Sequence, residues 1–202
     1  MKRTKKEYIE AKRIFIDFWQ HYVEHPITED AHAWFDRHAQ PITCRKHQYI
    51  IRDEDTERFG LFVCSGLIGQ LDTLPQYAHR RFLYIAQPLD FLLTVSNVYS
   101  QTPLYHPLVA LRSSLVIRFS TLSLRWLKEH LNEGNTLIHV TRERYIKRLR
   151  IINQLKLIPN EVDRYIQFYQ EMRELVLLTT QEEQAHYLNI SRSSITRALR
   201  KL

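Results

Sequence analysis

Hydrophobic positions along the chain change their spacing twice. From residue 5 to residue 24 apolar side chains recur at helical intervals, and the segment EDAHAWFDRHA predicts a second, shorter helix. Between Pro41 and Phe119 the period shortens to that of strands, and after Phe119 the helical period returns. The pattern therefore predicts helical segments on both sides of a central block of strands.

Turn residues divide the central block at intervals of about ten positions, as in an all-β unit. The strand-like segments are residues 42–52, 58–71, 80–88, 90–97 and 107–119. Gly66, within FVCSGL, suits a bulge or a tight bend inside a strand. This spacing predicts a sandwich, a barrel or a roll of antiparallel strands.

A long helix is predicted after the strands, behind a shorter one over residues 120–131. Asn135 or Thr136 can cap its start after Gly134, and Pro159 ends it. Its apolar stripe includes Ile138, Tyr145, Leu149 and Ile152. Two interpretations stay open: the stripe covers the core of its own domain, or it pairs with a partner helix.

Residues 160–202 predict three helices. Thr180 and Glu183 have the spacing of a capping box. Asn189 accepts the left-handed backbone of a tight turn, and Ser191 caps the last helix. This spacing is typical of a helix-turn-helix unit, in which the second helix contacts DNA.

The final helix has an apolar side and a basic side. Its inner face is predicted to bury Ile195, Ala198 and Leu199. The DNA-contacting residues are predicted to be Ser191, Arg192, Ser193, Thr196, Arg197 and Arg200, which suit phosphates and base edges. The other interpretation is an ordinary amphipathic packing helix.

Charge supports a polyanionic partner. The net charge is +7, the sequence pI is about 9.5, and no acidic residue lies between Ser191 and Leu202. No apolar run is long enough for a membrane span, and the basic start lacks the features of a signal peptide. Cys44 and Cys64 are expected to be buried free thiols, so we expect a cytoplasmic protein.

The sequence contains no recognisable set of catalytic residues. Four glycines cannot build a phosphate loop, and the ten histidines lack metal-ligand spacing. No nucleophile or acid/base constellation is present. We therefore expect no enzyme activity, no catalytic residue and no metal site, and the sequence identifies no cofactor.

The order of strand block, long helix and helix-turn-helix resembles the Crp/Fnr superfamily of bacterial transcription regulators. The resemblance covers about residues 30–202 and is carried by FVCSGLI, NEVDRYIQF and AHYLNISRSSITRAL. It implies an α+β fold with N-terminal helices and an antiparallel, cupin-like β-roll, then a dimerisation helix and a helix-turn-helix. In a departure from the family pattern, we expect no wing after the recognition helix. The implied domains are residues 1–134, 135–158 and 159–202.

The resemblance also implies partners. A homodimer, paired through Ile138, Tyr145, Leu149 and Ile152, would bind an imperfect palindrome in double-stranded DNA. The alternative is a β-roll protein that binds a small molecule or a partner and no longer binds DNA.

The effector pocket departs from the family pattern. Cyclic-nucleotide-binding members hold the ribose with a Gly-Glu pair and the phosphate with an Arg-Ser or Arg-Thr pair. The aligned positions here hold Leu93 and Thr94, then Tyr105 and His106, with Arg112 nearby as a substitute cation. We therefore expect a divergent pocket that binds neither cyclic AMP nor cyclic GMP, with an effector that the sequence does not identify.

Overall fold

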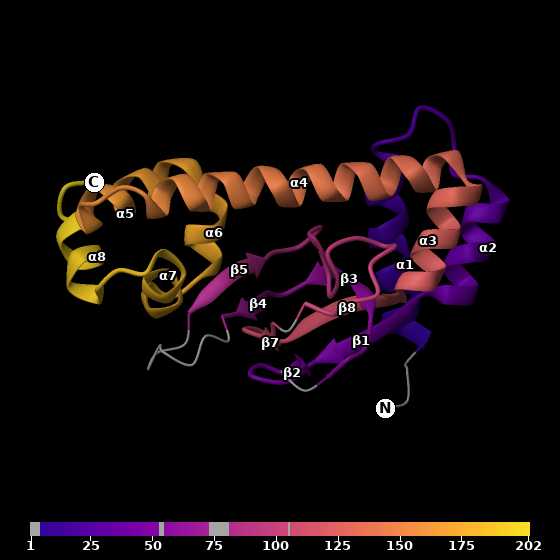
Figure 1. Cartoon of the computed structure of the whole chain (residues 1–202), viewed down its shortest axis with the longest axis horizontal. Coiled ribbons are helices and arrows are strands. Elements are labelled where there is room, and N and C mark those ends of the chain that lie inside the picture. Colours follow the sequence, from indigo (N-terminus) through magenta and orange to yellow (C-terminus); the bar gives the residue numbers. More distant parts are fainter. Residues whose placement is uncertain (1–4, 53–54, 73–80, 105) are drawn as a thin grey trace.

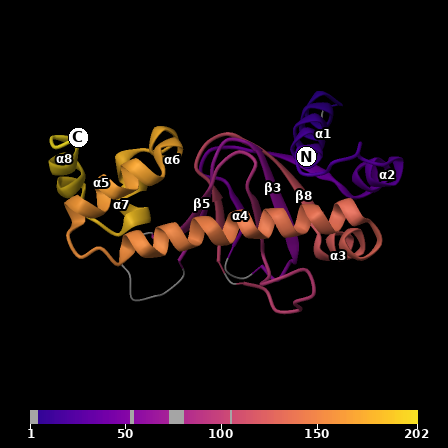
Figure 2. The same cartoon turned by 90° about the horizontal axis from the view of Figure 1, so that it is seen from above.

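A long helix organises the molecule. The computed structural model describes residues 5–52, 55–72, 81–104 and 106–202. The helices are α1 (Lys5–Gln20), α2 (Glu29–His38), α3 (Thr121–His130), α4 (Asn132–Lys156), α5 (Glu161–Glu171), α6 (Arg173–Leu178), α7 (Gln181–Leu188) and α8 (Arg192–Leu199). Figure 1 shows α4 running past the strands, with α1 to α3 at one end and α5 to α8 at the other, and Figure 2 shows the same order from above.

The strands form two four-stranded antiparallel sheets. They are β1 (Gln40–Cys44), β2 (Tyr49–Ile51), β3 (Phe59–Ser65), β4 (Ile68–Leu71), β5 (Phe82–Ala86), β6 (Phe91–Leu93), β7 (Leu108–Ala110) and β8 (Ser114–Ser120). One sheet has the order β1-β8-β3-β6 and the other β2-β7-β4-β5, so the chain crosses between sheets repeatedly. The predicted α+β fold with an antiparallel roll is confirmed.

Gly66 marks one of these crossings. It lies between β3 of one sheet and β4 of the other, with φ +87°, a conformation that side chains rarely adopt. A Cβ at this position would collide with the Ser114 hydroxyl oxygen and lie 2.6 Å from the Ser113 carbonyl oxygen. The predicted bend is confirmed, and it requires glycine for both backbone and space.

Aromatic side chains attach the N-terminal helices to the roll. Phe15 of α1 lies edge-on to Phe62 of β3, with ring centroids 5.0 Å apart. The Trp19 indole donates a hydrogen bond to the Glu133 carbonyl at 2.8 Å, and that of Trp34 donates to the Ser123 carbonyl at 3.1 Å. Because both indoles are buried and paired, this end of the molecule is a packed core.

The long helix begins earlier than predicted. It starts at Asn132, only one residue after α3 ends, and Gly134 lies inside it instead of preceding it. A Cβ on Gly134 would lie 2.5 Å from the Leu127 carbonyl oxygen. The glycine therefore permits close packing of α4 on α3, and the predicted caps at Asn135 and Thr136 are wrong.

The apolar stripe of α4 faces its own chain. Ile152 is fully buried and Ile138 nearly so, in clusters formed with the roll and with the helices at the two ends. Tyr145 packs on the Tyr84 ring at 4.9 Å, and Leu149 packs against buried residues of the roll. The chain itself thus covers Ile138 and Ile152, whereas Tyr145 and Leu149 stay partly exposed. Pairing of the stripe with a partner helix stays a prediction.

The C-terminal region has four helices where three were predicted. Met172, at φ −129° and ψ 40°, interrupts the segment read as one helix and separates α5 from α6. No helix in the described part of the chain is both long and apolar enough to cross a membrane.

Candidate functional site

Local signals build the helix-turn-helix as predicted. The Thr180 hydroxyl accepts a hydrogen bond from the Glu183 amide at 3.2 Å, and the Glu183 carboxylate accepts one from the Thr180 amide at 2.8 Å. Asn189 takes the left-handed conformation, with φ 56° and ψ 54°, after α7. The Ser191 hydroxyl then caps α8 by accepting from the Ser194 amide at 3.2 Å. Capping box, turn and cap are all confirmed.

One face of α8 is exposed and basic. Arg192, Thr196 and Arg200 follow one another at four-residue intervals on this face, and Ser193 is exposed beside them. The opposite face buries Ser194, Ile195 and Ala198. Leu199, predicted to be buried, is 39% exposed, because it lies beside Arg192 on the outward face. The helix therefore presents two arginines, two hydroxyl groups and one leucine to solvent.

Arg197 belongs to the flank of α8. It follows Arg192 by five positions, about 140° around a helix. Its guanidinium donates a hydrogen bond to the Ser194 hydroxyl at 2.7 Å. Arg197, Arg200 and Lys201 line a groove of about 570 Å³ between α8 and the start of α5. With Glu161 as the one acidic residue lining it, this groove suits a phosphate-bearing backbone more than a neutral ligand.

Glu161 fixes the start of α8. Its carboxylate accepts hydrogen bonds from the Ser191 amide at 3.0 Å and the Ser191 hydroxyl at 2.9 Å. Hydrogen bonds from Ser194 and Ser191 outweigh partial burial and lower the pKa of Glu161 below its ordinary value. Ser191, predicted to contact DNA, is thus occupied as a cap and as a partner of α5.

Arg164 holds the turn and was missed by sequence reasoning. Its guanidinium donates to the Leu188 carbonyl at 3.1 Å and to the Ile158 carbonyl at 2.6 Å. Leu188 is the last residue of α7, where helix geometry leaves carbonyls unpaired, and Ile158 lies two residues after the end of α4. The arginine in NEVDRYIQF was the available signal, but nothing in a sequence says which carbonyls an arginine will reach.

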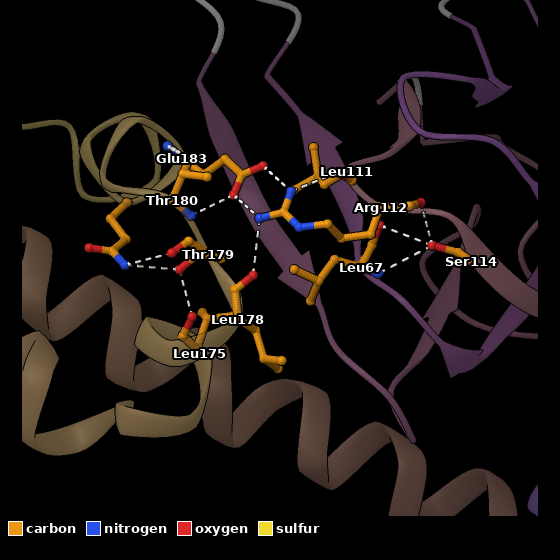
Figure 3. Close-up of polar contacts among 10 residues, drawn as sticks. Leu67, Leu111, Arg112, Ser114, Leu175, Leu178, Thr179, Thr180 and Glu183 are labelled. Carbon is orange, nitrogen blue, oxygen red and sulfur yellow. Dashed lines mark hydrogen bonds and ion pairs between the residues drawn. The ribbon is translucent and has the colours of Figure 1, made fainter.

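Arg112 connects the roll to the C-terminal helices. It lies in the turn between β7 and β8, and its guanidinium forms two hydrogen bonds to Glu183 of α7, at 2.7 and 2.8 Å (Figure 3). A third hydrogen bond reaches the Leu178 carbonyl at 3.1 Å. Arg112 is therefore committed to an interdomain ion pair, and its prediction as an effector-pocket cation is wrong.

The ion pair shifts both protonation equilibria. Burial would raise the pKa of Glu183, but hydrogen bonds from Arg112 and Thr180 outweigh it and lower that pKa. The hydrogen bonds to Glu183 raise the pKa of Arg112. Glu183 thus serves two structures at once: the cap of α7 and the attachment of α7 to the roll.

Further contacts, several of them buried, attach α4, α6 and α7 to the roll. Arg148 of α4 pairs with Asp90, which lies in the turn before β6 and is 4% exposed. Gln87 donates a hydrogen bond to Glu174 of α6 at 3.1 Å. Tyr187 of α7 is fully buried, and burial raises the pKa of its hydroxyl. The roll, the long helix and the C-terminal helices therefore meet in a region rich in polar contacts.

A separate cavity of about 280 Å³ lies between the roll and the other half of α4. Its lining comes from β6, the following loop, α3 and α4: Phe91, Leu93, Val95, Ser96, Asn97, Val98, Tyr99, Leu104, Lys128, Asn135, Ile138, His139, Thr141, Arg142 and Tyr145. The lining mixes apolar side chains with Lys128 and Arg142.

The predicted effector-pocket residues are mostly elsewhere. Of the four that the structure describes, Leu93 is the one that lines this cavity. Thr94 is buried, where its hydroxyl accepts from the Phe59 amide at 2.9 Å, so it stabilises the sheet. His106 does not reach the lining, and Tyr105 lies outside the described residues. Thr94 directly follows β6, which pairs with β3, and the β3 backbone therefore takes up its hydroxyl. For this reason Thr94 does not line the cavity.

The two cysteines have the predicted state. Cys44 and Cys64 are buried free thiols. Burial raises their pKa values to about 11 and about 12. Neither thiol therefore ionises near neutral pH. Within the described residues, no group of three or more histidine, cysteine or acidic side chains could hold a metal ion.

No protein-family model matches the sequence, and no curated protein sequence matches it significantly. Solved structures do match the fold. FixK2 from Bradyrhizobium japonicum aligns with TM-score 0.68 and 16% identity over 81% of this chain and 84% of its own. A CooA variant from Carboxydothermus hydrogenoformans aligns with TM-score 0.69 and 12% identity over 87% and 80%.

A regulator assigned to the Crp/Fnr family from Eubacterium rectale aligns with TM-score 0.63 and 14% identity, over 87% of this chain and 83% of its own. Each alignment covers more than four-fifths of this chain. The chain has the fold of the Crp/Fnr transcription regulators.

Proposed function

We propose that this protein is a DNA-binding transcription regulator of the Crp/Fnr type. The observation that carries the proposal is α8, an exposed basic helix held on a fully capped helix-turn-helix. The Eubacterium rectale neighbour, with the same fold, is described as a transcriptional regulator. The net charge of +7 favours a polyanionic partner.

Each cation of α8 has a distinct expected role. Arg192 and Arg200, on the outward face, are placed to reach base edges in the major groove, where arginine pairs with guanine. Arg197 and Lys201, on the flank, are placed to contact phosphates, which set the register of the helix on the duplex. Loss of the first pair should relax sequence preference, whereas loss of the second should weaken all sequences alike.

A dimer is part of the proposal. One eight-residue helix reads only a few base pairs, and two helices related by two-fold symmetry read half-sites roughly 34 Å apart. Since the apolar stripe of α4 is largely covered by its own chain, pairing would use a more exposed face of the helix. That face carries His139, Glu143, Ile146 and Arg150, with Leu157 80% exposed just beyond the helix.

DNA selected from random sequence and measured by fluorescence anisotropy tests the proposal. We expect an imperfect palindrome and a steep fall in affinity with salt. Arg192→Ala with Arg200→Ala should cost about 1–3 kcal/mol per lost base contact. Arg13→Ala with Arg37→Ala, both exposed on helices at the far end, is the charge-matched control and should bind as wild type.

Unchanged binding by the α8 double variant would refute the assignment of this helix. If no fragment is selected at low salt, the alternative remains: a roll that binds a small molecule or a partner and no longer binds DNA. A monomer by light scattering at micromolar concentration, together with tight binding to one half-site, would refute the dimer.

The proposal excludes cyclic nucleotides as the effector. A buried phosphate needs a fixed cation or a nest of backbone donors. Arg112, the candidate substitute, is held by Glu183 instead. Calorimetric titration with cyclic AMP and cyclic GMP should show no saturable heat. A dissociation constant below about 10 µM, roughly −7 kcal/mol, would contradict this expectation.

A further inference from the structure

We propose that the cavity between the roll and α4 binds a small ligand with an apolar body and a single anionic head group, such as a medium-chain or aromatic carboxylate. The inference rests on the proposed function only in treating the ligand as an effector. Binding itself can be measured without DNA.

The inner wall of the cavity is apolar. Phe91, Val95, Val98 and Ile138 are buried residues that line it, and Leu93 is half-buried beside them. These side chains come from β6, from the loop after it and from α4. A ligand here would remove apolar surface from water on several sides, which is the main source of affinity for small molecules.

The rim carries positive charge. Lys128 of α3 lies 4.9 Å above the Tyr99 ring, and Arg142 of α4 is exposed. Among the described residues, neither cation has an ion pair, and no aspartate or glutamate lines the cavity. A carboxylate at the rim would meet two cations that no carboxylate of the described residues pairs with, whereas an ammonium group would be repelled.

Size narrows the ligand class. Small-molecule pockets span roughly 300–1,000 Å³, and this cavity of about 280 Å³ lies at the lower end. A bulky or multiply charged ligand would leave polar groups against Phe91 and Ile138 without hydrogen-bond partners. The lining therefore favours one short alkyl chain or one aromatic ring.

Three ligands with the same chain test the head group. Octanoate, octanol and octylamine are titrated calorimetrically into the full-length protein at neutral pH, with 3-phenylpropanoate as the aromatic carboxylate. We expect both carboxylates to saturate with dissociation constants below about 1 mM. Octanol should bind at least about tenfold more weakly, because it lacks charge-assisted contacts, and octylamine should not bind.

Charge variants then locate the site. Lys128→Gln and Arg142→Gln should each weaken octanoate about tenfold and leave octanol within about twofold. Lys147→Gln, exposed further along α4 and outside the cavity lining, is the matched control and should bind octanoate as wild type. Circular dichroism checks that each variant is folded.

The inference is wrong if neither carboxylate saturates below about 1 mM, if octylamine binds as tightly as octanoate, or if both charge variants bind octanoate normally. The selected DNA fragments are measured with the same protein preparation. If the protein binds the selected DNA but no carboxylate, the proposed ligand class is wrong and the proposed function stands. If it binds a carboxylate but no DNA, the proposed function is wrong and the ligand class stands.

Discussion

The ion pair between Arg112 and Glu183 gives the sharpest test of how the roll holds the C-terminal helices α7 and α8. Replacing Arg112 with alanine removes two hydrogen bonds to the Glu183 carboxylate and one to the Leu178 carbonyl. The turn between β7 and β8 then loses its polar contact with α7. We expect α7 and α8 to separate from the roll more often than in the wild type.

The magnitude follows from geometry and exposure. Hydrogen bonds to charged groups contribute about 1.5–3 kcal/mol, whereas exposed ion pairs contribute about 0.2–1 kcal/mol. Arg112 and Glu183 are 31% and 15% exposed, between these limits. The coupling energy between the two side chains should therefore be about 1–2 kcal/mol.

A double-mutant cycle measures this coupling by urea unfolding. Arg112→Ala is combined with Glu183→Gln, which removes the charge and retains a residue that can complete the capping box. Thr180→Ala is the control: it removes the cap of α7 and leaves the ion pair. Amide hydrogen exchange in α7 should accelerate in the ion-pair variants even where global unfolding changes little.

Acid should act through the same pair. Glu183 has a lowered pKa when folded, so its contribution to stability is present above the ordinary glutamate pKa and is lost as the pH falls through the lowered value. Arg112→Ala should flatten the stability curve in that acidic window. A coupling energy within about 0.5 kcal/mol of zero, as for independent sites, would refute the reasoning.

Three further substitutions test the fold and the proposed DNA binding. Gly66→Ala should lower the free energy of unfolding by at least about 2 kcal/mol, because of the positive φ and the contact with Ser114; wild-type stability by urea unfolding would contradict this. Asp90→Asn removes the charge opposite the mostly buried Arg148 and should lower the free energy of unfolding by about 3 kcal/mol, again measured by urea unfolding. Adding Arg148→Met to the Asp90→Asn variant should recover part of this loss. Arg164→Met should weaken DNA binding in the anisotropy assay and leave the dependence of affinity on salt unchanged, because Arg164 orients the turn and does not touch phosphate. A weaker dependence on salt would instead indicate that Arg164 contacts phosphate directly.

Local features were predictable because their signals lie within a few residues. The capping box needs only Thr180 and Glu183 at their spacing, and the left-handed turn needs only a residue such as Asn189 that tolerates it. Gly66 was recognised for the same reason. Strand periodicity likewise predicted the roll, although each long strand-like segment at residues 42–52, 58–71 and 107–119 proved to be a pair of strands on different sheets.

Long-range partners were not predictable, because a sequence shows that a side chain needs burial or pairing but not what supplies it. The stripe of α4 signals a buried face equally well whether a partner helix or the roll covers it. Arg112 was expected in a pocket, yet its guanidinium reaches a carboxylate 71 positions later. Ile195 and Ala198 are buried as predicted from periodicity, but Leu199 is 39% exposed, and Ser194 is buried instead.

The two halves of the molecule are coupled through packing as well as through Arg112. One apolar cluster contains Phe82 of the roll, Ile152 of α4 and Tyr187 of α7. The cavity reaches the same helix at Tyr145, seven residues from Ile152, or about 10 Å along α4. Close-packed clusters resist small displacements and switch between discrete packings. A ligand in the cavity would therefore affect α8 only by binding one position of α4 more tightly than another. The C-terminal helices are therefore packed on the roll and on α4 through one shared apolar cluster.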